Sequence, residues 1–366
     1  MACVVGPENE GCDGASMAPI CGDDNTCRGC LENSECASDV CGDNGACIAD
    51  SAIIYVDGAK GADAGACPQD TPCKTIAYAL TKVTSGKSTI HIAAGTYSAA
   101  DTLSITKDVT LIGAGADPTD VNVYVVPVDK DVIRVEDAAV TIDNIHITGA
   151  HGDPSLADGI DCRADPTASL TITRSLVDSN DGLGLRSDSC NITANQSTVA
   201  ANDGGGIKVD GGTYEIVNNL VFANGNGITS TFGGLFLSSN ETTNVIANNT
   251  IHENLANGNA GGVVCFAAAT GRGNIVYGND NDQLSDNCAF TYSDIDGAAD
   301  KDKHNISADP QFVDGDNIDL EKRDYHLKPT SPCIDAADPA TAPTTDMDGD
   351  PRDDGAPDIG ADEAAS

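Results

Sequence analysis

Charged side chains recur at equivalent places in successive stretches of similar sequence, each directly after an apolar residue that follows a glycine. Successive side chains of a β-strand point to opposite faces, so burying the apolar residue turns the charged residue outward. Two outer columns are therefore expected, one of Asp161, Arg186 and Lys208 and one of Arg163, Asp188 and Asp210. Carboxylates and cations on one strand face can bind a long polymer, or act on it as acid and base. The simpler alternative is ion pairing between neighbouring stretches, which stabilises an exposed surface little.

A second group of carboxylates alternates near the C-terminus. Asp346, Asp348 and Asp350 resemble the first three ligands of a calcium loop, and oxygen ligands suit this hard cation. A calcium loop has its turn glycine at the sixth position, whereas Gly349 stands at the fourth position here and Pro351 follows. The pattern predicts low-affinity calcium binding, and calcium is the only cofactor that the sequence suggests.

The elements that position these residues are repeats. An Asn or Ser, a β-branched residue and a further Asn recur at intervals of roughly 22 to 30 residues, the period of a solenoid. The copies are Ser175-Val177-Asn180, Ser197-Val199-Asn202, Asn219-Val221-Asn224, Asn249-Ile251-Asn254 and Asn274-Val276-Asn279. Each period carries three short strand-like runs, which predict one triangular coil of a parallel β-helix. Asn residues are expected to form a column at a bend, because Asn tolerates left-handed backbone angles and its amide can bond the Asn above and below.

The stretch before the repeats has a different composition. Residues 1–50 contain eight of the 15 cysteines and few apolar residues, which predicts a small module held together by disulfides. Ile76, Ala79, Leu80 and Val83 then follow at helical spacing. A short helix is therefore expected to cover the open end of the first coil, where strand edges would otherwise recruit other chains.

The overall composition narrows the possible partners. A net charge of −38 with only 19 basic residues excludes nucleic acid, because binding phosphates relies on clustered Lys and Arg. No apolar run reaches the roughly 20 residues that a membrane span needs. Fifteen cysteines without clustered His favour disulfides in an oxidising compartment over zinc. Outside the N-terminal module the expected pairs are Cys67–Cys73, Cys162–Cys190 and Cys265–Cys288, which leaves Cys333 alone. If Cys3 carries a lipid, fourteen cysteines remain and all of them can pair.

Two interpretations of Cys3 remain open. Ala2-Cys3 resembles the end of a bacterial lipoprotein processing site, in which the Cys becomes lipidated. Alternatively, Cys3 pairs with Cys12 inside the small module. A lipid on Cys3 is the only membrane contact that the sequence suggests.

Three stretches resemble known families. The N-x-V-x-x-N…G-I pattern resembles the right-handed parallel β-helix repeats of the pectate-lyase-like superfamily, over roughly residues 90 to 330. The stretch 156–161, Leu-Ala-Asp-Gly-Ile-Asp, is similar to the Asn-Thr-Asp-Gly-Ile-Asp stretch of polygalacturonases, whose paired carboxylates hydrolyse glycosides, although Leu156-Ala157 replaces Asn-Thr. The stretches Asp309-Pro310-Gln311-Phe312, Ser331-Pro332-Cys333 and Pro357-Asp358-Ile359-Gly360 resemble the closing segment of surface-anchored bacterial β-helix proteins, which implies a terminal coil and cap on an exported protein.

The predicted fold class is all-β: a right-handed parallel β-helix solenoid over residues 51–330 with a short N-terminal capping helix. A disulfide-rich module over residues 1–50 precedes it, and a closing coil and cap over residues 331–366 follow it. The expected function is that of a non-catalytic extracellular or cell-surface protein, which binds glycan or protein or builds an assembly through its strand faces. The alternative is a polysaccharide lyase or glycoside hydrolase that acts on a polymer laid along the outer strand face. Self-assembly into fibres is a third hypothesis.

Overall fold

The computed structural model describes residues 12, 20–21, 26–31, 33–42, 44–163, 167–352 and 355–364. The chain divides into two compact units, Met1–Gly95 with Leu111–Ala114, and Thr96–Thr110 with Gly115–Ser366. It passes from one unit to the other within β5 (Gly95–Ala99) and β7 (Val109–Gly113). The domain boundaries predicted at residues 50 and 330 stay predictions.

The first unit is held largely by disulfides. Its elements are β1 (Ile20–Cys21), β2 (Cys27–Arg28), η1 (Asn33–Glu35), η2 (Asp50–Ala52), β3 (Ile53–Val56), α1 (Ile76–Leu80) and β4 (Thr89–Ile92). Strands β1 and β2 pair antiparallel, and β3 and β4 pair parallel. Helix α1 begins where the side chain of Thr75 accepts a hydrogen bond from the Tyr78 backbone N–H, and Ile76 and Ala79 are its buried residues. The predicted helix is therefore present, over fewer residues than the apolar spacing suggested.

The disulfides of both units include the three pairs predicted outside the N-terminal module. Within the first unit they join Cys12–Cys27, Cys30–Cys41, Cys36–Cys47 and Cys67–Cys73, and within the second Cys162–Cys190 and Cys265–Cys288. The pairing of Cys3 with Cys12 is wrong, because Cys12 is bonded to Cys27. Cys3 itself, with its predicted lipid, lies outside the described residues. Cys333 is free and buried, as expected.

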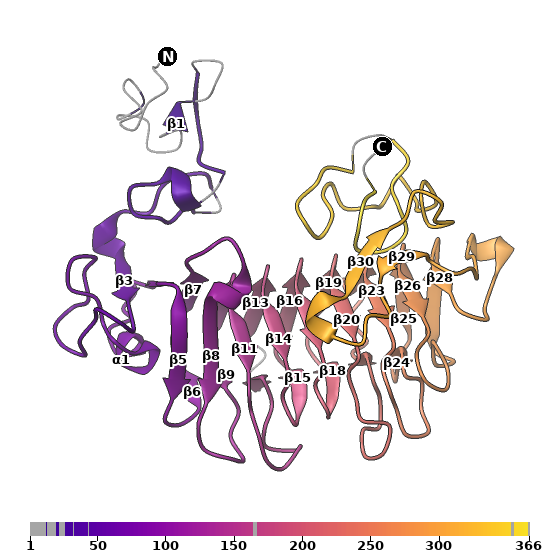
Figure 1. Ribbon diagram of the computed structural model, residues 1–366, viewed down its shortest axis with the longest axis horizontal. Helices are drawn as coiled ribbons and strands as arrows, with labels where there is room; N and C mark the ends of the chain where they lie inside the picture. The colour runs from indigo at the N-terminus through magenta and orange to yellow at the C-terminus, as the bar shows by residue number, and fades with distance from the viewer. Residues whose placement is uncertain are drawn as a thin grey trace. The chain divides into compact units, whose positions relative to one another are not determined.

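Three parallel sheets build the second unit, and their strands lie side by side along the solenoid (Figure 1). Within this unit, sheet A contains β10 (Ala139–Asp143), β13 (Ser169–Thr173), β16 (Asn191–Asn195), β19 (Tyr214–Val217), β22 (Val245–Ala247), β25 (Ala269–Arg272) and β27 (Cys288–Thr291). Sheet B contains β5, β8 (Val121–Val125), β11 (His146–Thr148), β14 (Leu176–Asp178), β17 (Thr198–Ala200), β20 (Leu220–Phe222), β23 (Thr250–His252), β26 (Ile275–Tyr277) and β28 (Asp294–Ile295). Sheet C contains β6 (Leu103–Ile105), β9 (Ile133–Glu136), β12 (Ile160–Arg163), β15 (Leu183–Asp188), β18 (Gly205–Asp210), β21 (Leu235–Ser238) and β24 (Val263–Cys265).

Each strand pairs in parallel with the equivalent strand of the next coil, so identical positions stack. Val177 of β14, for example, lies opposite Val199, which lies opposite Val221, and all three are buried. The glycines of the repeat are required by this close stacking: a Cβ on Gly184 would lie 2.6 Å from Val199 Cγ1. Three strands per turn around a shared apolar interior make a parallel β-helix, the architecture that the repeats predict.

Two ladders of polar side chains run along the corners of the coils, as predicted. One consists of Asn180, Asn202, Asn224, Asn254 and Asn279, and the other of Ser175, Ser197, Asn219, Asn249, Asn274 and Ser293. The Asn202 side-chain amide donates to Asn224 Oδ1 at 2.9 Å, and the Asn224 amide donates to Asn254 Oδ1 at 3.0 Å. These residues are buried, so the ladder satisfies backbone groups that water cannot reach.

The explanation of the ladder by left-handed backbone angles is wrong. Positive φ angles occur at the residue before the ladder Asn, for example 53° at both Ala201 and Ala223. The Asn that follows directs its backbone N–H at the amide oxygen of the next coil, as Asn202 N–H does at Asn224 Oδ1, 3.2 Å away. The preceding residue therefore makes the bend, and the Asn joins the coils.

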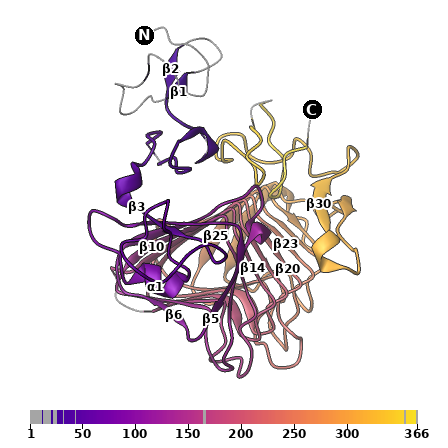
Figure 2. The same ribbon diagram turned by 60° about the vertical axis from the view of Figure 1, so that its left-hand side comes forward.

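The C-terminal part of the second unit folds along one side of the coils, where β30 lies beside sheet B (Figure 2). It contains η4 (Lys301–Lys303), η5 (Leu320–Lys322) and an antiparallel hairpin of β29 (Phe312–Asp314) and β30 (Asp324–Leu327). Phe222 of β20 and Ile275 of β26 share a buried cluster with Tyr325 and Leu327 of β30. The described residues contain no helix long and apolar enough to cross a membrane.

Candidate functional site

The strand register of sheet C aligns both predicted charged columns. Asp161 lies opposite Arg186, and Arg186 opposite Lys208. The second column is also in register, in the order Arg163, Asp188 and Asp210. Arg134 of β9 precedes Asp161 in the first column, and Phe236 of β21 follows Lys208.

Asp161 does not reach solvent, contrary to the outward position expected for it. Its exposed fraction is 0 %, and those of Asp131 and Asp158 are also 0 %. The guanidinium group of Arg163 forms an ion pair with Asp161, and Arg134 Nε lies 3.5 Å from Asp161 Oδ2. Arg134 also forms an ion pair with Asp131. The arginines of β9 and β12 and the turns that carry Asp131 and Asp158 thus enclose a carboxylate that strand alternation alone would expose.

Asp158 connects two coils. One carboxylate oxygen, Oδ2, accepts a hydrogen bond from Arg186 Nε at 2.5 Å, and Oδ1 accepts from the Leu183 backbone N–H at 2.7 Å. The backbone N–H of Asp158 donates to Asp131 Oδ1 at 3.1 Å. The Asp-Gly-Ile-Asp stretch therefore contributes two buried, ion-paired carboxylates rather than a pair open to a substrate.

The environment shifts the ionisation of this cluster. The pKa of Asp161 is raised to about 6, chiefly by burial and then by the negative charge of Asp131, while Arg163 acts in the lowering direction. Burial also raises the pKa of Asp158. For Arg186 burial acts in the lowering direction, but the hydrogen bond to Asp158 and the negative charges of the three carboxylates together outweigh it, and the pKa is raised. Within the described part of the chain, Asp161 Oδ1 and Arg134 Nε have no hydrogen-bond partner.

This ionisation predicts a pH dependence of folding stability. The pKa of Asp161 is higher in the folded protein than in the unfolded chain, where Asp has a pKa of about 3.9. The stabilising contribution of the protonated carboxyl is therefore complete below pH of about 4, and it is lost as the pH rises through about 6. We expect Asp161→Asn to flatten the stability profile between these values, measured by urea unfolding at a series of pH values.

A matched control for this prediction is Asp153→Asn, because Asp153 is exposed and its pKa is lowered by hydrogen bonds from Ser155. The free energy of unfolding of this variant should depend on pH between about 4 and about 6 as steeply as that of the native protein. A carbon NMR titration of the Asp161 carboxyl that gives a midpoint near 4, the ordinary Asp value, contradicts the prediction.

The exposed part of the cluster is cationic. The side chains of Arg134, Arg163 and Arg186 are 27 %, 45 % and 24 % exposed, whereas the three carboxylates beneath them are fully buried. Lys208 Nζ lies 3.6 Å from Asp210 Oδ2, and Asp188 and Asp210 are exposed. The outer face of sheet C thus offers guanidinium and ammonium donors beside carboxylate acceptors.

Phe236 continues the first column beyond Lys208, and Val264 lies opposite Phe236 in the next coil. Lys208 Nζ lies 5.6 Å from the ring centre of Phe236, whose ring stacks on Phe266 at 6.2 Å. Phe266 is 72 % exposed. The charged pattern in the sequence does not include these two rings, although the register of Gly206 and Gly234 places Phe236 next to Lys208.

The residues of the predicted calcium site do not form a ligand cluster in the described part of the chain. Asp346 Oδ1 accepts hydrogen bonds from the backbone N–H groups of Asp348 and Asp350, at 2.9 and 2.8 Å. Asp346 Oδ2 accepts from the Glu363 N–H at 3.0 Å. Asp348 instead lies near His326, with 3.2 Å between Oδ2 and Nε2. Asp346 therefore stabilises the turn through both of its oxygens.

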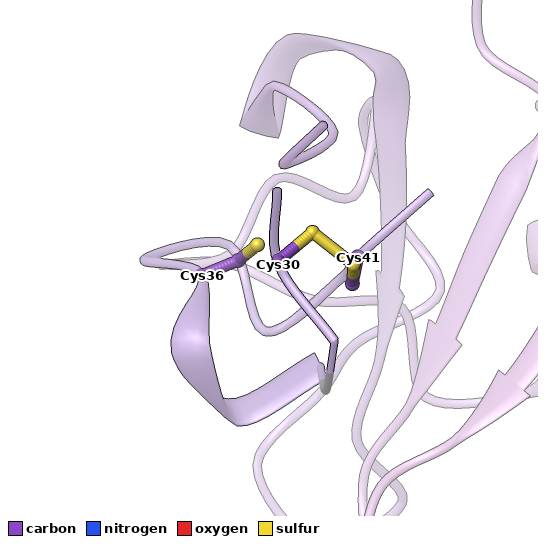
Figure 3. Close-up of side chains that lie close together, drawn as sticks. All are labelled: Cys30, Cys36 and Cys41. Carbon is purple, nitrogen blue, oxygen red and sulfur yellow. A yellow bond between two sulfur atoms is a disulfide. The ribbon is translucent and has the colours of Figure 1, made fainter. Parts of the chain in front are cut away.

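A group of cysteines in the first unit, Cys30, Cys36 and Cys41, has the proximity of metal ligands. Cys30 and Cys41 are joined to each other, as Figure 3 shows, and Cys36 is bonded to Cys47. Disulfide sulfurs are not thiolates, the form in which Cys binds metals. This cluster is structural.

Comparison with known proteins gives a family match over part of the chain: residues 133–297 match the family model described as a right handed beta helix region. No curated protein matches the chain. Among solved structures, the chain is similar to the crystal structure of pectate lyase Pel9A, with 16 % identity over 86 % of this chain and 96 % of that chain and a TM-score of 0.48. The match over residues 133–297 and the three parallel sheets agree on one fold, a right-handed parallel β-helix.

Proposed function

We propose that the protein is a non-catalytic extracellular or cell-surface protein that binds a neutral polysaccharide along the outer face of sheet C. The observation that carries this proposal is the first column itself. It runs from Arg134, past the buried Asp161, through Arg186 and Lys208 to Phe236, whose ring stacks on the exposed ring of Phe266.

The chemistry of this face suits sugars. Hydroxyl groups both donate and accept hydrogen bonds, so a surface that mixes arginine and lysine donors with the carboxylates of Asp188 and Asp210 can satisfy them. The apolar faces of sugar rings can pack on Phe236 and Phe266, which offer large rigid surfaces at low entropic cost. A net charge of −38 disfavours an acidic polymer, which leaves a neutral one.

The burial of the carboxylates supports a non-catalytic role. A general acid or base must lie within hydrogen-bonding reach of the substrate. Asp158 and Asp161 are fully buried and paired with arginines, so neither carboxylate contacts the surface where a polymer would lie. Disulfides along the chain support a location outside the cell, since they persist in oxidising compartments.

The proposal predicts which side chains contribute to affinity. Phe266→Ala and Lys208→Ala should each weaken binding of a recognised polysaccharide by about five- to tenfold, because each removes an interaction of roughly 1 kcal/mol. Affinity electrophoresis against a panel of soluble neutral and uronate polymers, followed by calorimetry on any polymer that binds, measures this effect.

Lys328→Ala is the control, because Lys328 is an exposed lysine of the closing segment and should leave affinity unchanged. Loss of binding in this variant, or undiminished binding in both Phe266→Ala and Lys208→Ala, would locate the interaction elsewhere. Retention by uronate polymers alone would reject a neutral ligand.

The alternative function is that of a polysaccharide lyase or glycoside hydrolase. One observation favours it: Asp161 has an unpaired carboxylate oxygen and a pKa raised to about 6, a value that suits proton transfer near neutral pH. A turnover assay on the same polymers, with Asp161→Ala and Lys208→Ala beside the native protein, distinguishes the two functions. Cleavage that both variants abolish would reject the non-catalytic proposal.

A further inference from the structure

Three potential metal ligands lie close together on the second unit, and they come from separate parts of its closing segment, here taken from residue 309 onward. His326 belongs to β30, Asp348 to the turn after Asp346, and Asp362 to the last described stretch of the chain. One ligand atom from each lies within 4.8 Å of the other two. This constellation is distinct from the face of sheet C, and it shares only Asp348 with the calcium site predicted from the sequence.

The imidazole ring of His326 is held by two carboxylates. Nδ1 lies 2.5 Å from Asp324 Oδ1, and Nε2 lies 3.2 Å from Asp348 Oδ2. A histidine that binds a metal through one nitrogen commonly donates its other N–H to a carboxylate, which fixes the ring and its tautomer. Asp324 occupies that supporting position here, and Nε2 faces the other two ligands.

Asp362 adds a buried negative charge to the site. It is 5 % exposed, and its Oδ2 accepts a hydrogen bond from the Leu327 backbone N–H at 2.7 Å. No described donor contacts its other oxygen, and no described Lys or Arg forms an ion pair with Asp348 or Asp362. Burial raises the pKa of Asp362, against the lowering effects of the Leu327 N–H and of His326.

We propose that His326 Nε2, Asp348 and Asp362 bind a divalent transition-metal ion of the zinc or manganese class. One imidazole nitrogen with two carboxylate oxygens is a ligand set that such ions accept, whereas calcium takes oxygen ligands alone. Ligand atoms about 2.1 Å from a tetrahedral ion lie about 3.4 Å apart, close to the 3.2 Å between His326 and Asp348. The ion joins β30, the turn at residues 346–350 and the end of the closing segment.

The ion stabilises the fold in proportion to the logarithm of its concentration, because the unfolded chain does not assemble the site.

Calorimetry on the full-length, metal-stripped protein tests the proposal, with ZnCl₂, MnCl₂ and CaCl₂ titrated separately. We expect one equivalent of zinc or manganese to bind and to raise the thermal unfolding temperature. His326→Ala and Asp348→Asn should each weaken binding at least tenfold, by about 1.4 kcal/mol or more. Asp362→Asn retains an acceptor for the Leu327 N–H, so its circular dichroism spectrum shows whether a loss of binding comes from the ligand or from the fold.

His304→Ala is the matched control, because His304 is an exposed histidine that stacks on Tyr292 away from the site. It should bind metal as the native protein does. The proposal is overturned if no transition metal binds, if calcium binds equally well, or if His326→Ala leaves binding unchanged while His304→Ala removes it.

Discussion

Replacing Arg352 with alanine is expected to lower the free energy of unfolding by about 3–5 kcal/mol, the cost of removing one partner from a buried ion pair. The Arg352 side chain is 0 % exposed and lies 2.7 Å from Glu363 Oε2, which is itself buried. Its guanidinium also donates to the backbone carbonyls of Asp358, Gly360 and Ala361 at 2.9–3.1 Å. The variant would remove the cationic donor from these buried acceptors and from the Glu363 carboxylate, to which the Asp358 backbone N–H would still donate at 2.9 Å. Urea unfolding, followed by far-ultraviolet circular dichroism, measures the change.

The comparison for this prediction is Arg174→Ala. Arg174 also forms an ion pair, with Asp143 at 2.6 Å, but its side chain is 58 % exposed. Because the Arg174 guanidinium reaches water, this variant should lose less stability than Arg352→Ala, although Asp143 itself is only 11 % exposed and still accepts from Thr173. Similar losses in the two variants would show that burial of Arg352 does not determine its contribution.

Replacing Asn224 with alanine is expected to destabilise the protein by about 3 kcal/mol, since each buried group left without a partner costs about 1–3 kcal/mol. Asn224 Oδ1 accepts from both the backbone N–H and the side chain of Asn202, at 3.2 and 2.9 Å. Its amide donates to Asn254 Oδ1 and to the Val199 carbonyl, at 3.0 and 2.8 Å. The loss reaches both neighbouring coils because the hydrogen bonds run in both directions.

Asn240→Ala is the control for the ladder variant, because Asn240 is an exposed asparagine in a loop of the same unit. Its expected effect lies within about 0.5 kcal/mol of zero. Thermal and urea unfolding should rank the two variants in this order. If Asn224→Ala and Asn240→Ala unfold at the same temperature and the same urea concentration, the ladder is not a major source of stability.

The sequence predicted the parts of the fold that repeat. Identical spacing from coil to coil places Asn180, Asn202 and Asn224 in one ladder, and strand alternation places Arg186 and Lys208 in one column. Both arguments depend only on the period of the repeat and on the geometry of a strand. Neither needs information about contacts between distant parts of the chain.

The sequence did not predict what irregular segments do to those columns. Asp161 was expected on the surface, but Arg134 and Asp131 come from a coil that lacks the repeat pattern, and Asp158 comes from a turn. Whether they enclose Asp161 depends on side-chain packing that spacing does not encode. Strand alternation therefore predicted the position of Asp161 in its column correctly, but the prediction that Asp161 is exposed was wrong.

The C-terminal acidic residues show a second limit. Alternating Asp residues indicate oxygen atoms that are close together, but not whether backbone N–H groups already use them. Both oxygens of Asp346 accept such hydrogen bonds, whereas Asp348 points to His326 from β30. The ligand set that we propose includes residues distant in sequence, so no local motif could have revealed it.

The bends of successive coils also hold the closing segment. Gln196 and Asn218, each the residue with positive φ before a ladder residue, donate to the carbonyls of Asp346 and Thr345, both at 2.7 Å, and Asn248 donates to that of Asp358 at 3.1 Å. A solenoid can usually gain or lose a rung by duplication or deletion of one repeat, because each rung touches only its neighbours. Here the closing segment is hydrogen-bonded to three successive coils, so the number of coils between residues 196 and 248 is fixed. Adding or removing a coil in this region would move the donors away from their carbonyl acceptors. Such variation is therefore expected only in coils that the closing segment does not contact.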